Sequence, residues 1–99
     1  MAVKKKAAVK QIDQLETFKI LADANRFRAI ELLSRAGKKG ISVGDLSDAL
    51  KMNHSAASHL LGYLHTREIV AFKKEGRAVC YALAATPIAR KLVKLQKMS

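Results

Sequence analysis

The chain has 99 residues, of which 49% are hydrophobic and 5% aromatic, enough for one domain with an aliphatic core. Nineteen Lys and Arg against eight Asp and Glu give a net charge of +11, which favours a polyanionic partner, either nucleic acid or an anionic membrane surface. No stretch is long and apolar enough to span a membrane, and the single cysteine excludes an internal disulfide bond.

The first ten residues, MAVKKKAAVK, are rich in Lys and Ala and lack the apolar stretch of a signal peptide. We expect residues 1–10 to form a basic N-terminal arm and residues 11–99 to form a single domain. With only one cysteine, Cys80, the chain is typical of a reducing compartment, so we expect a cytoplasmic protein.

Apolar residues at three- and four-residue steps predict two helices in the first third of the chain, at about 8–22 and 24–36. Gly37 ends the second helix, a turn follows at 38–40, and Ile41 forms a very short strand. The apolar stripe of the first helix comprises Ile12, Leu15, Phe18, Leu21 and Ala22. The inward-facing residues of the second helix are Phe27, Ile30 and Leu33.

Two further helices follow, each opened by a residue that favours the N-cap position. Ser42 opens a short helix, because Asp45 completes a capping-box pattern. Asn53 caps a fourth helix that runs to about Thr66. The apolar face of the short helix is expected to comprise Leu46, Ala49 and Leu50.

The last third of the chain predicts a β-hairpin and a final helix. Two strands are expected at 69–72 and 78–83, with 73–77 as the loop between them. Thr86 followed by Pro87 predicts the start of a helix over about 87–97. The order α-α-α-α-β-β-α predicts a mainly α fold with a β-hairpin wing, the layout of a winged helix-turn-helix.

The fourth helix has two faces of different chemistry. Its buried stripe is expected to comprise Ala57, Leu60, Leu61 and Leu64. The opposite face is small and polar, and no carboxylate occurs from Asn53 to Arg67. Such a face suits a DNA major groove about 12 Å wide, whereas a helix face selected only for solubility usually mixes Glu and Lys. The residues of this outer face are Ser55, Ser58, His59 and Gly62.

Basic residues lie at both ends of the fourth helix and in the loop of the hairpin that follows it. Phosphate contacts set the register of a protein on DNA while base contacts read the sequence, and this segment offers both kinds of donor. The N-terminal end of the helix is expected to touch base edges, and its free backbone N–H groups can hold a phosphate. The predicted DNA-binding residues are Lys51, Asn53, His54, Ser55, Ala56, Ser58, His59, Gly62, Arg67, Lys73, Lys74 and Arg77.

Three phrases, in the right order, resemble the ArsR/SmtB family of bacterial and archaeal repressors over about residues 12–97. Residues 21–33, LADANRFRAIELL, are similar to the family phrase L-A-D-P-x-R-x-x-I-L-x-L-L, and residues 76–83, GRAVCYAL, resemble its wing. The recognition-helix phrase S-x-S-x-x-S-x-H-L-x-x-L is matched at Asn53, Ser55, Ser58, Leu61 and Leu64. The chain departs from the family at Leu60, where a His is frequent, and at Glu68, where a Gly usually makes the turn, so strain or a different turn shape is expected at Glu68.

The resemblance implies a homodimer in which the first and last helices pack across a two-fold axis. Such a dimer places two recognition helices about one DNA turn apart, so its operator should be an inverted repeat. The apolar residues expected at this interface are Ile12, Leu15, Phe18, Ile88, Leu92 and Leu95.

Many members of this family release DNA on binding a metal or on oxidation of a cysteine pair. Here the third helix reads DLSDA in place of Cys-x-Cys, and the last helix has no His, Asp, Glu or Cys. His54, His59 and His65 do not share a face, and the pair of His65 and Glu68 is interpreted as a surface contact. We therefore expect no metal and no cofactor, and a structural role for Cys80. A phosphate-binding glycine loop, a nucleophile elbow and an HExxH motif are all missing, so the chain is not expected to be an enzyme.

Three functions remain open on these grounds. The main hypothesis is a sequence-specific regulator of transcription, a repressor, that binds double-stranded DNA as a homodimer. The alternative is an architectural protein that binds DNA largely without regard to its sequence, which the net charge and the basic arm also favour. A winged-helix module that binds another protein is the third hypothesis.

Overall fold

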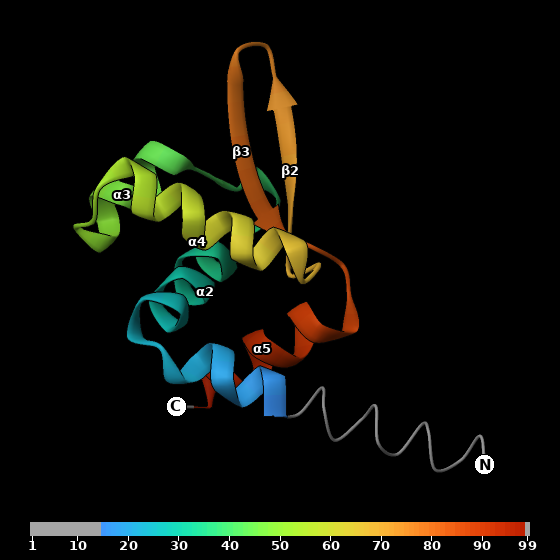
Figure 1. The fold of residues 1–99 in the computed structure, drawn as a ribbon. Coiled ribbons are helices and arrows are strands. Elements are labelled where there is room, and N and C mark those ends of the chain that lie inside the picture. Colours follow the sequence, from blue (N-terminus) through green and yellow to red (C-terminus); the bar gives the residue numbers. More distant parts are fainter. Residues whose placement is uncertain (1–14, 99) are drawn as a thin grey trace.

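In the computed structural model, residues 15–98 are described, and they form a helical body from which a two-stranded wing projects (Figure 1). Residues 15–22 are helical and precede α2 (Ala24–Ala36), the short 3₁₀ helix η1 (Gly37–Lys39) and β1 (Ile41–Ser42). They are followed by α3 (Val43–Leu50), α4 (His54–Thr66), β2 (Val70–Glu75), β3 (Ala78–Leu83) and α5 (Pro87–Lys97). This order confirms the predicted winged helix-turn-helix, including the very short strand at Ile41. The expected basic arm and Ile12 lie outside the described residues.

Side chains at helix starts fix the boundaries of the helices, as the sequence predicts for α3, α4 and α5. In each of four helices the N-cap side chain accepts the backbone N–H of the residue three places later, at 2.7–3.3 Å. The four capping residues are Asp23, Ser42, Asn53 and Thr86. At the other end of α2, Gly37 adopts φ +60° and its N–H donates to the carbonyl of Leu33, so this helix ends where expected.

The sheet has three antiparallel strands in the order β1-β3-β2. The wing is longer than predicted, because β2 continues through residues 73–75 and only Gly76 and Arg77 form the turn. The prediction ended this strand where its apolar residues end. The outer half of the hairpin is exposed and needs no apolar side chains, so its length is set by backbone pairing with β3. Lys73 and Lys74 therefore lie on opposite faces of a strand rather than in a loop.

The core lies where the helices of the body meet the base of the wing, and aliphatic side chains fill it. In α3 the prediction is partly wrong, because Ala49 is exposed while Ser47 is buried. The Ser47 hydroxyl donates to the carbonyl of Met52 at 2.6 Å, which satisfies this polar group and fixes the turn after the helix. The largest fully buried aliphatic side chains are Ile20, Ile30, Leu33, Leu46, Leu61, Leu64, Ile69 and Leu92.

The turn between α4 and β2 has the unusual backbone that the replacement of glycine by Glu68 predicts. Glu68 adopts φ +60°, a left-handed conformation that costs a residue with a Cβ about 1–2 kcal/mol. The carbonyl of Glu68 accepts the hydroxyl hydrogen of Thr86 at 2.7 Å, so the start of α5 holds this turn in place.

Candidate nucleic-acid interface

The two faces of α4 are divided as predicted. Its leucines point into the body: Leu61 and Leu64 are fully buried and Leu60 is half-buried. The outer face is open to solvent, and a Cβ built on Gly62 meets no atom within 4 Å other than its chain neighbours and the backbone of its own helix. The exposed residues of this face, with the neighbouring residues of the first turn, are His54, Ser55, Ala56, Ser58, His59 and Gly62.

The turn that joins α3 to α4 positions the N-terminal end of α4. Lys51 ends α3 in a left-handed conformation, φ 54°, and is exposed. The Oδ1 atom of Asn53 accepts the backbone N–H of Ala56 at 2.7 Å, so this side chain starts the helix. The side-chain amide N–H₂ group of Asn53 keeps its donors, since the cap uses only the oxygen.

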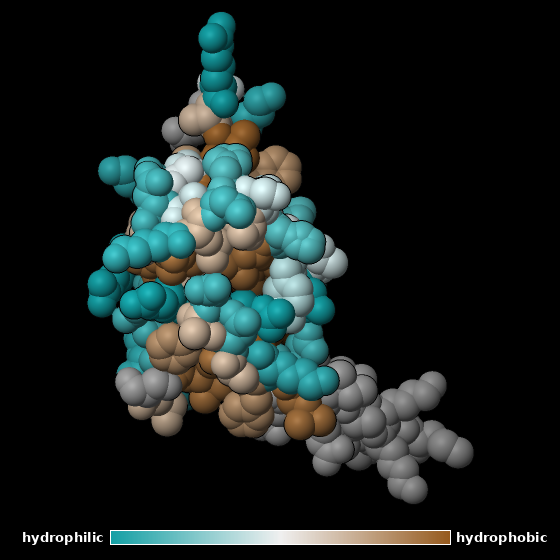
Figure 2. All heavy atoms as spheres, turned by 60° about the vertical axis from the view of Figure 1, so that its left-hand side comes forward, coloured by the Kyte–Doolittle hydropathy of each residue, from teal (hydrophilic) through white to brown (hydrophobic). Residues whose placement is uncertain are grey.

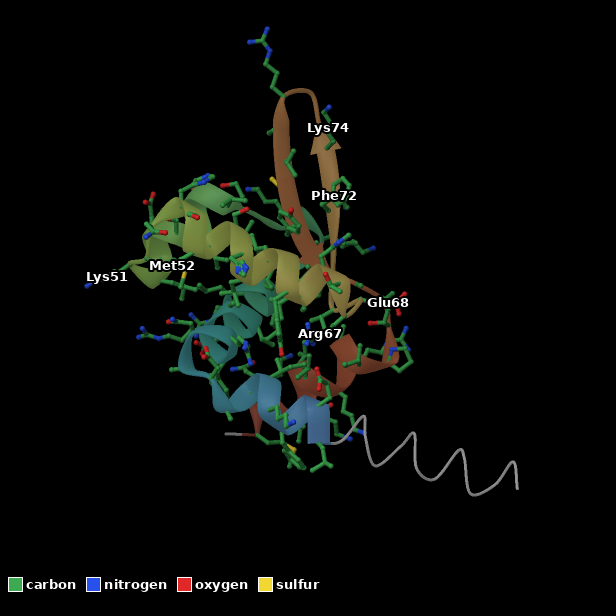
Figure 3. The ribbon with its side chains drawn as sticks, viewed as in Figure 1. Lys51, Met52, Arg67, Glu68, Phe72 and Lys74 are labelled. Carbon is green, nitrogen blue, oxygen red and sulfur yellow. The ribbon has the colours of Figure 1, made fainter. Side chains whose placement is uncertain are left out.

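The two lysines of β2 lie on opposite faces of the wing. Lys73 pairs with Cys80, which also pairs with Ser42 of β1, and the Nζ atom of Lys73 donates to the carbonyl of Lys38 at 3.1 Å. Lys74 projects from the same side of β2 as Phe72 (Figure 3). Arg77, in the exposed turn, is at the tip, and hydrophilic side chains project from the top of the molecule in Figure 2.

The contact from Lys73 also brings η1 to the wing, and with it two cations that sequence reasoning missed. Lys38 and Lys39 are exposed on η1, which lies beside β3. The only sequence signal was their charge, because Lys38 and Lys73 are 35 residues apart and are joined through the fold. The fold therefore brings η1, with its two exposed lysines, next to Lys73 of the wing.

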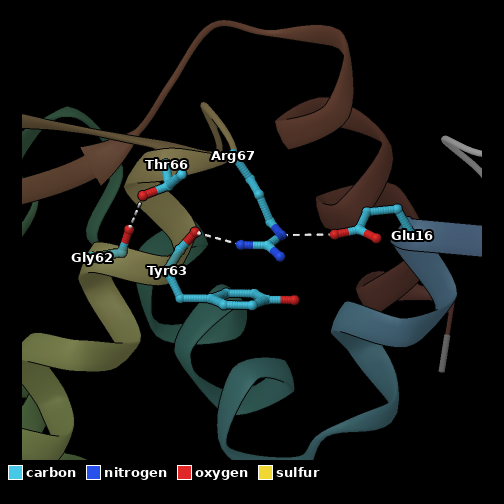
Figure 4. A network of polar contacts seen from close by, with 5 residues as sticks. All are labelled: Glu16, Gly62, Tyr63, Thr66 and Arg67. Atoms are coloured by element: carbon cyan, nitrogen blue, oxygen red, sulfur yellow. Dashed lines mark hydrogen bonds and ion pairs between the residues drawn. The ribbon is translucent and has the colours of Figure 1, made fainter.

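Arg67 is held within the protein rather than directed outward (Figure 4). Its Nε atom bonds to the Glu16 carboxylate at 2.7 Å, and its Nη1 atom donates to the carbonyl of Tyr63 at 3.4 Å. The guanidinium carbon lies 3.6 Å from the centre of the Tyr63 ring, and that of Arg26 lies 4.1 Å from the same centre. We therefore propose that Arg67 ties α4 to the first helix, in place of the predicted phosphate contact.

This network has a measurable signature in the pKa of Glu16. The hydrogen bond from Arg67 is the main cause that lowers this pKa below its usual value of 4.5; burial opposes the shift. A carboxylate with a lowered pKa in the folded state stabilises the fold above its unfolded pKa, and the contribution is lost as the pH falls through the folded value.

Glu16→Gln is therefore expected to lower the free energy of unfolding at pH 7 by up to about 1 kcal/mol, because the pair is partly exposed to solvent. The difference from the wild type should shrink as the pH falls below 4.5. Urea unfolding at pH 7 and pH 3 measures both values. Glu31→Gln, which removes the exposed pair with Arg35, is the matched control and should have a smaller effect. An equal loss for Glu16→Gln at both pH values would contradict the assignment.

The residues proposed for dimerisation divide into three groups. Leu15 and Phe18 are 62% and 59% exposed on the first helix, and Ile88 and Leu95 are half-buried on α5. Thr17 of the first helix and Ile88 line one cleft, so these two helices are neighbours. The prediction for Leu92 is wrong, because this residue is fully buried in the core and has no surface to offer a partner.

The described residues bring together no group of three or more His, Cys, Asp or Glu side chains that could hold a metal ion. Cys80 is half-buried in β3. Nor does any helix within residues 15–98 have the length and apolar character needed to cross a membrane.

A helix-turn-helix followed by a basic β-hairpin defines a winged-helix protein of the DNA-binding class. No protein-family model matches the sequence. The chain is 39% identical over 69 residues to a transcriptional repressor SmtB homolog of Synechocystis sp., a match that covers 70% of this chain and 50% of that protein. It is 37% identical over 84 residues to an uncharacterized HTH-type transcriptional regulator of Mycobacterium tuberculosis, covering 84% of this chain and 71% of the relative. The chain thus spans about half the length of the first of these relatives.

Among solved structures, the transcriptional repressor BigR from Xylella fastidiosa superposes with a TM-score of 0.81 at 19% identity, over 96% of this chain and 91% of that one. This likeness confirms the fold. The chain belongs to the ArsR/SmtB family of winged-helix transcriptional repressors. The relatives it matches are regulators of transcription rather than enzymes.

Proposed function

We propose that this chain represses transcription by binding a specific double-stranded operator, as a homodimer on an inverted repeat. The division of α4 carries the proposal: its leucines are buried in the body and its serine and histidine side chains are exposed. A helix with this division can enter the major groove without losing its place in the core.

The exposed residues divide into two kinds of contact. Side chains near the N-terminal end and middle of α4 read base edges, because they are small or carry hydrogen-bond donors and acceptors. The proposed base-reading residues are His54, Ser55, Ala56, Ser58, His59 and Gly62. Cations around the helix and on the wing fix the register by contacting phosphates. The proposed phosphate contacts are Lys51, Lys73, Lys74 and Arg77, with Lys38 and Lys39 added from the structure, while Asn53 shapes the start of α4.

The homodimer is supported by the exposed apolar side chains on the first helix and by the half-buried ones on α5. Large apolar groups such as Leu15 and Phe18 are costly to leave in water, and a second copy of the same surface can cover them. We further propose that the protein acts in the cytoplasm without a bound metal, and that it is not an enzyme.

Variants on the two kinds of contact test the proposal. Ser58→Ala and His59→Ala are expected to change the preferred bases, each by about 1–3 kcal/mol in discrimination, because the lost donors face the groove. Lys73→Ala should weaken binding to operator and random DNA alike. Lys97→Ala, an exposed cation on the side of α5 away from Ile88 and Leu95, is the matched control and should change neither. Selection of bound fragments from a random library, followed by titration, measures both effects. Equal losses on specific and random DNA from all three contact variants would overturn the proposal.

The net charge of +11 also favours the alternative of an architectural protein that coats DNA without reading its sequence. The same selection separates the two functions. Enrichment of an inverted repeat supports the repressor, and a flat profile supports the architectural protein.

A further inference from the structure

A groove of about 450 Å³ lies between the end of β3 and one side of α5, away from α4 and the wing tip. Its floor is apolar and is formed by Leu83, Ala84, Ala89 and Val93. Its edge carries three cationic side chains, those of Arg90, Lys94 and Lys97. Volumes of this size are typical of sites for small organic molecules.

The charge of this edge is not balanced by the protein. No residue lining the groove is acidic, and within the described part of the chain the side chains of Arg90, Lys94 and Lys97 make no ion pair or hydrogen bond. They follow one another at i, i+4 and i+7, so neighbouring cations repel one another along the helix. The helix dipole favours cations in the last turn, which accounts for Lys94 and Lys97 but not for Arg90 in the first half of α5. An anion in the groove would relieve this repulsion.

The groove lies on the side of α5 away from the residues proposed for dimerisation. Each residue turns an α-helix by about 100°, so Arg90 lies about 200° around the axis from Ile88, and Lys97 lies the same angle from Leu95. A partner copy that covers Ile88 and Leu95 therefore leaves Arg90 and Lys97 accessible, while Lys94 lies about 100° from Leu95, at the border between the two sides.

We propose that this groove binds a small amphipathic organic anion, with its apolar body on Ala84, Ala89 and Val93 and its anionic head group on Arg90 and Lys94. A guanidinium can bind a carboxylate or phosphate group through two parallel hydrogen bonds, and the neighbouring ammonium adds charge. The apolar floor selects against small inorganic anions, because these gain nothing from covering it. This site does not depend on DNA binding, so its failure would leave the proposed function standing.

Octanoate is a suitable probe, since it combines a carboxylate with a short apolar tail. Calorimetric titration of the full chain is expected to show saturable binding of octanoate. Acetate, which lacks the tail, and 1-octanol, which lacks the charge, should each bind at least about tenfold more weakly. The double variant Arg90→Gln, Lys94→Gln should lose at least about tenfold in octanoate affinity, while Lys91→Ala, on another side of the same helix, should bind as the wild type does.

Three results would overturn the proposal: no saturable octanoate binding, acetate bound as tightly as octanoate, or unchanged octanoate affinity in the double variant. Both altered side chains are exposed, so circular dichroism should show the double variant folded as the wild type is. Val93→Asp gives a second, independent test, because it places a negative charge on the half-buried floor and should abolish octanoate binding while both cations remain.

Discussion

Raising the salt concentration from 50 to 200 mM is expected to weaken operator binding by about 10³–10⁵-fold, if the proposed dimer contacts roughly 6–10 phosphates. Each contact releases counterions from the DNA, so the logarithm of the affinity falls linearly with the logarithm of the salt concentration. The cations that surround α4 and line the wing, on two protomers, suffice for contacts of this number. Fluorescence anisotropy with a labelled duplex, at four or more salt concentrations, measures the slope.

The slope also identifies which cations touch phosphate. In a dimer, Lys73→Ala removes two contacts and is expected to lower the slope by about 1.8, since each phosphate contributes about 0.9. Lys97→Ala should leave the slope unchanged, because Lys97 is on α5 and on the side away from Ile88 and Leu95. An affinity that does not depend on salt would instead favour the third hypothesis, a module that binds another protein.

What could be predicted from the sequence is what depends on neighbours along the chain. The N-caps Ser42, Asn53 and Thr86 were predicted because each bonds to a backbone N–H only three residues away. The division of α4 was predicted because helical periodicity places every fourth side chain on the same face. The strain at Glu68 was predicted from a single substitution, since the turn needs a conformation that glycine adopts at low cost.

What could not be predicted depends on contacts between distant segments. The sequence alone indicates that Arg67 is a surface cation. In the fold, the carboxylate of Glu16, 51 residues away, lies at its Nε atom. Leu92 fits an exposed apolar stripe equally well, but α2 packs against α5 and the core covers this side chain. In α3 the polar side chain of Ser47 was not predicted to be buried. It is buried because its hydroxyl donates a hydrogen bond to a nearby carbonyl. The wing was predicted too short because its outer half is held by backbone pairing between β2 and β3, and the hydropathy of the sequence does not report such pairing.

Substitutions on the two faces of α4 are expected to separate folding from DNA recognition. Leu61 is fully buried, so Leu61→Ala should lower the free energy of unfolding by about 2–5 kcal/mol through lost burial and the cavity left behind. Small domains have only about 5–15 kcal/mol of net stability, so this loss is a large share. Ser58 is exposed on the same helix, and Ser58→Ala should change stability by no more than about 0.5 kcal/mol. Urea unfolding at one fixed protein concentration measures both, because the proposed dimerisation would make stability depend on concentration.

In DNA binding the two variants are expected to differ in the opposite sense, with the base preference changed by Ser58→Ala and not by Leu61→Ala. Ser58→Ala changes the preferred base at its position while the protein remains folded. The folded fraction of Leu61→Ala keeps the wild-type preference, because Leu61 does not reach the groove. A loss of stability in Ser58→Ala comparable to that in Leu61→Ala would show that the polar face is packed rather than open. In that event α4 would no longer be available to DNA, and the basic charge around it would be explained only as a solvated surface.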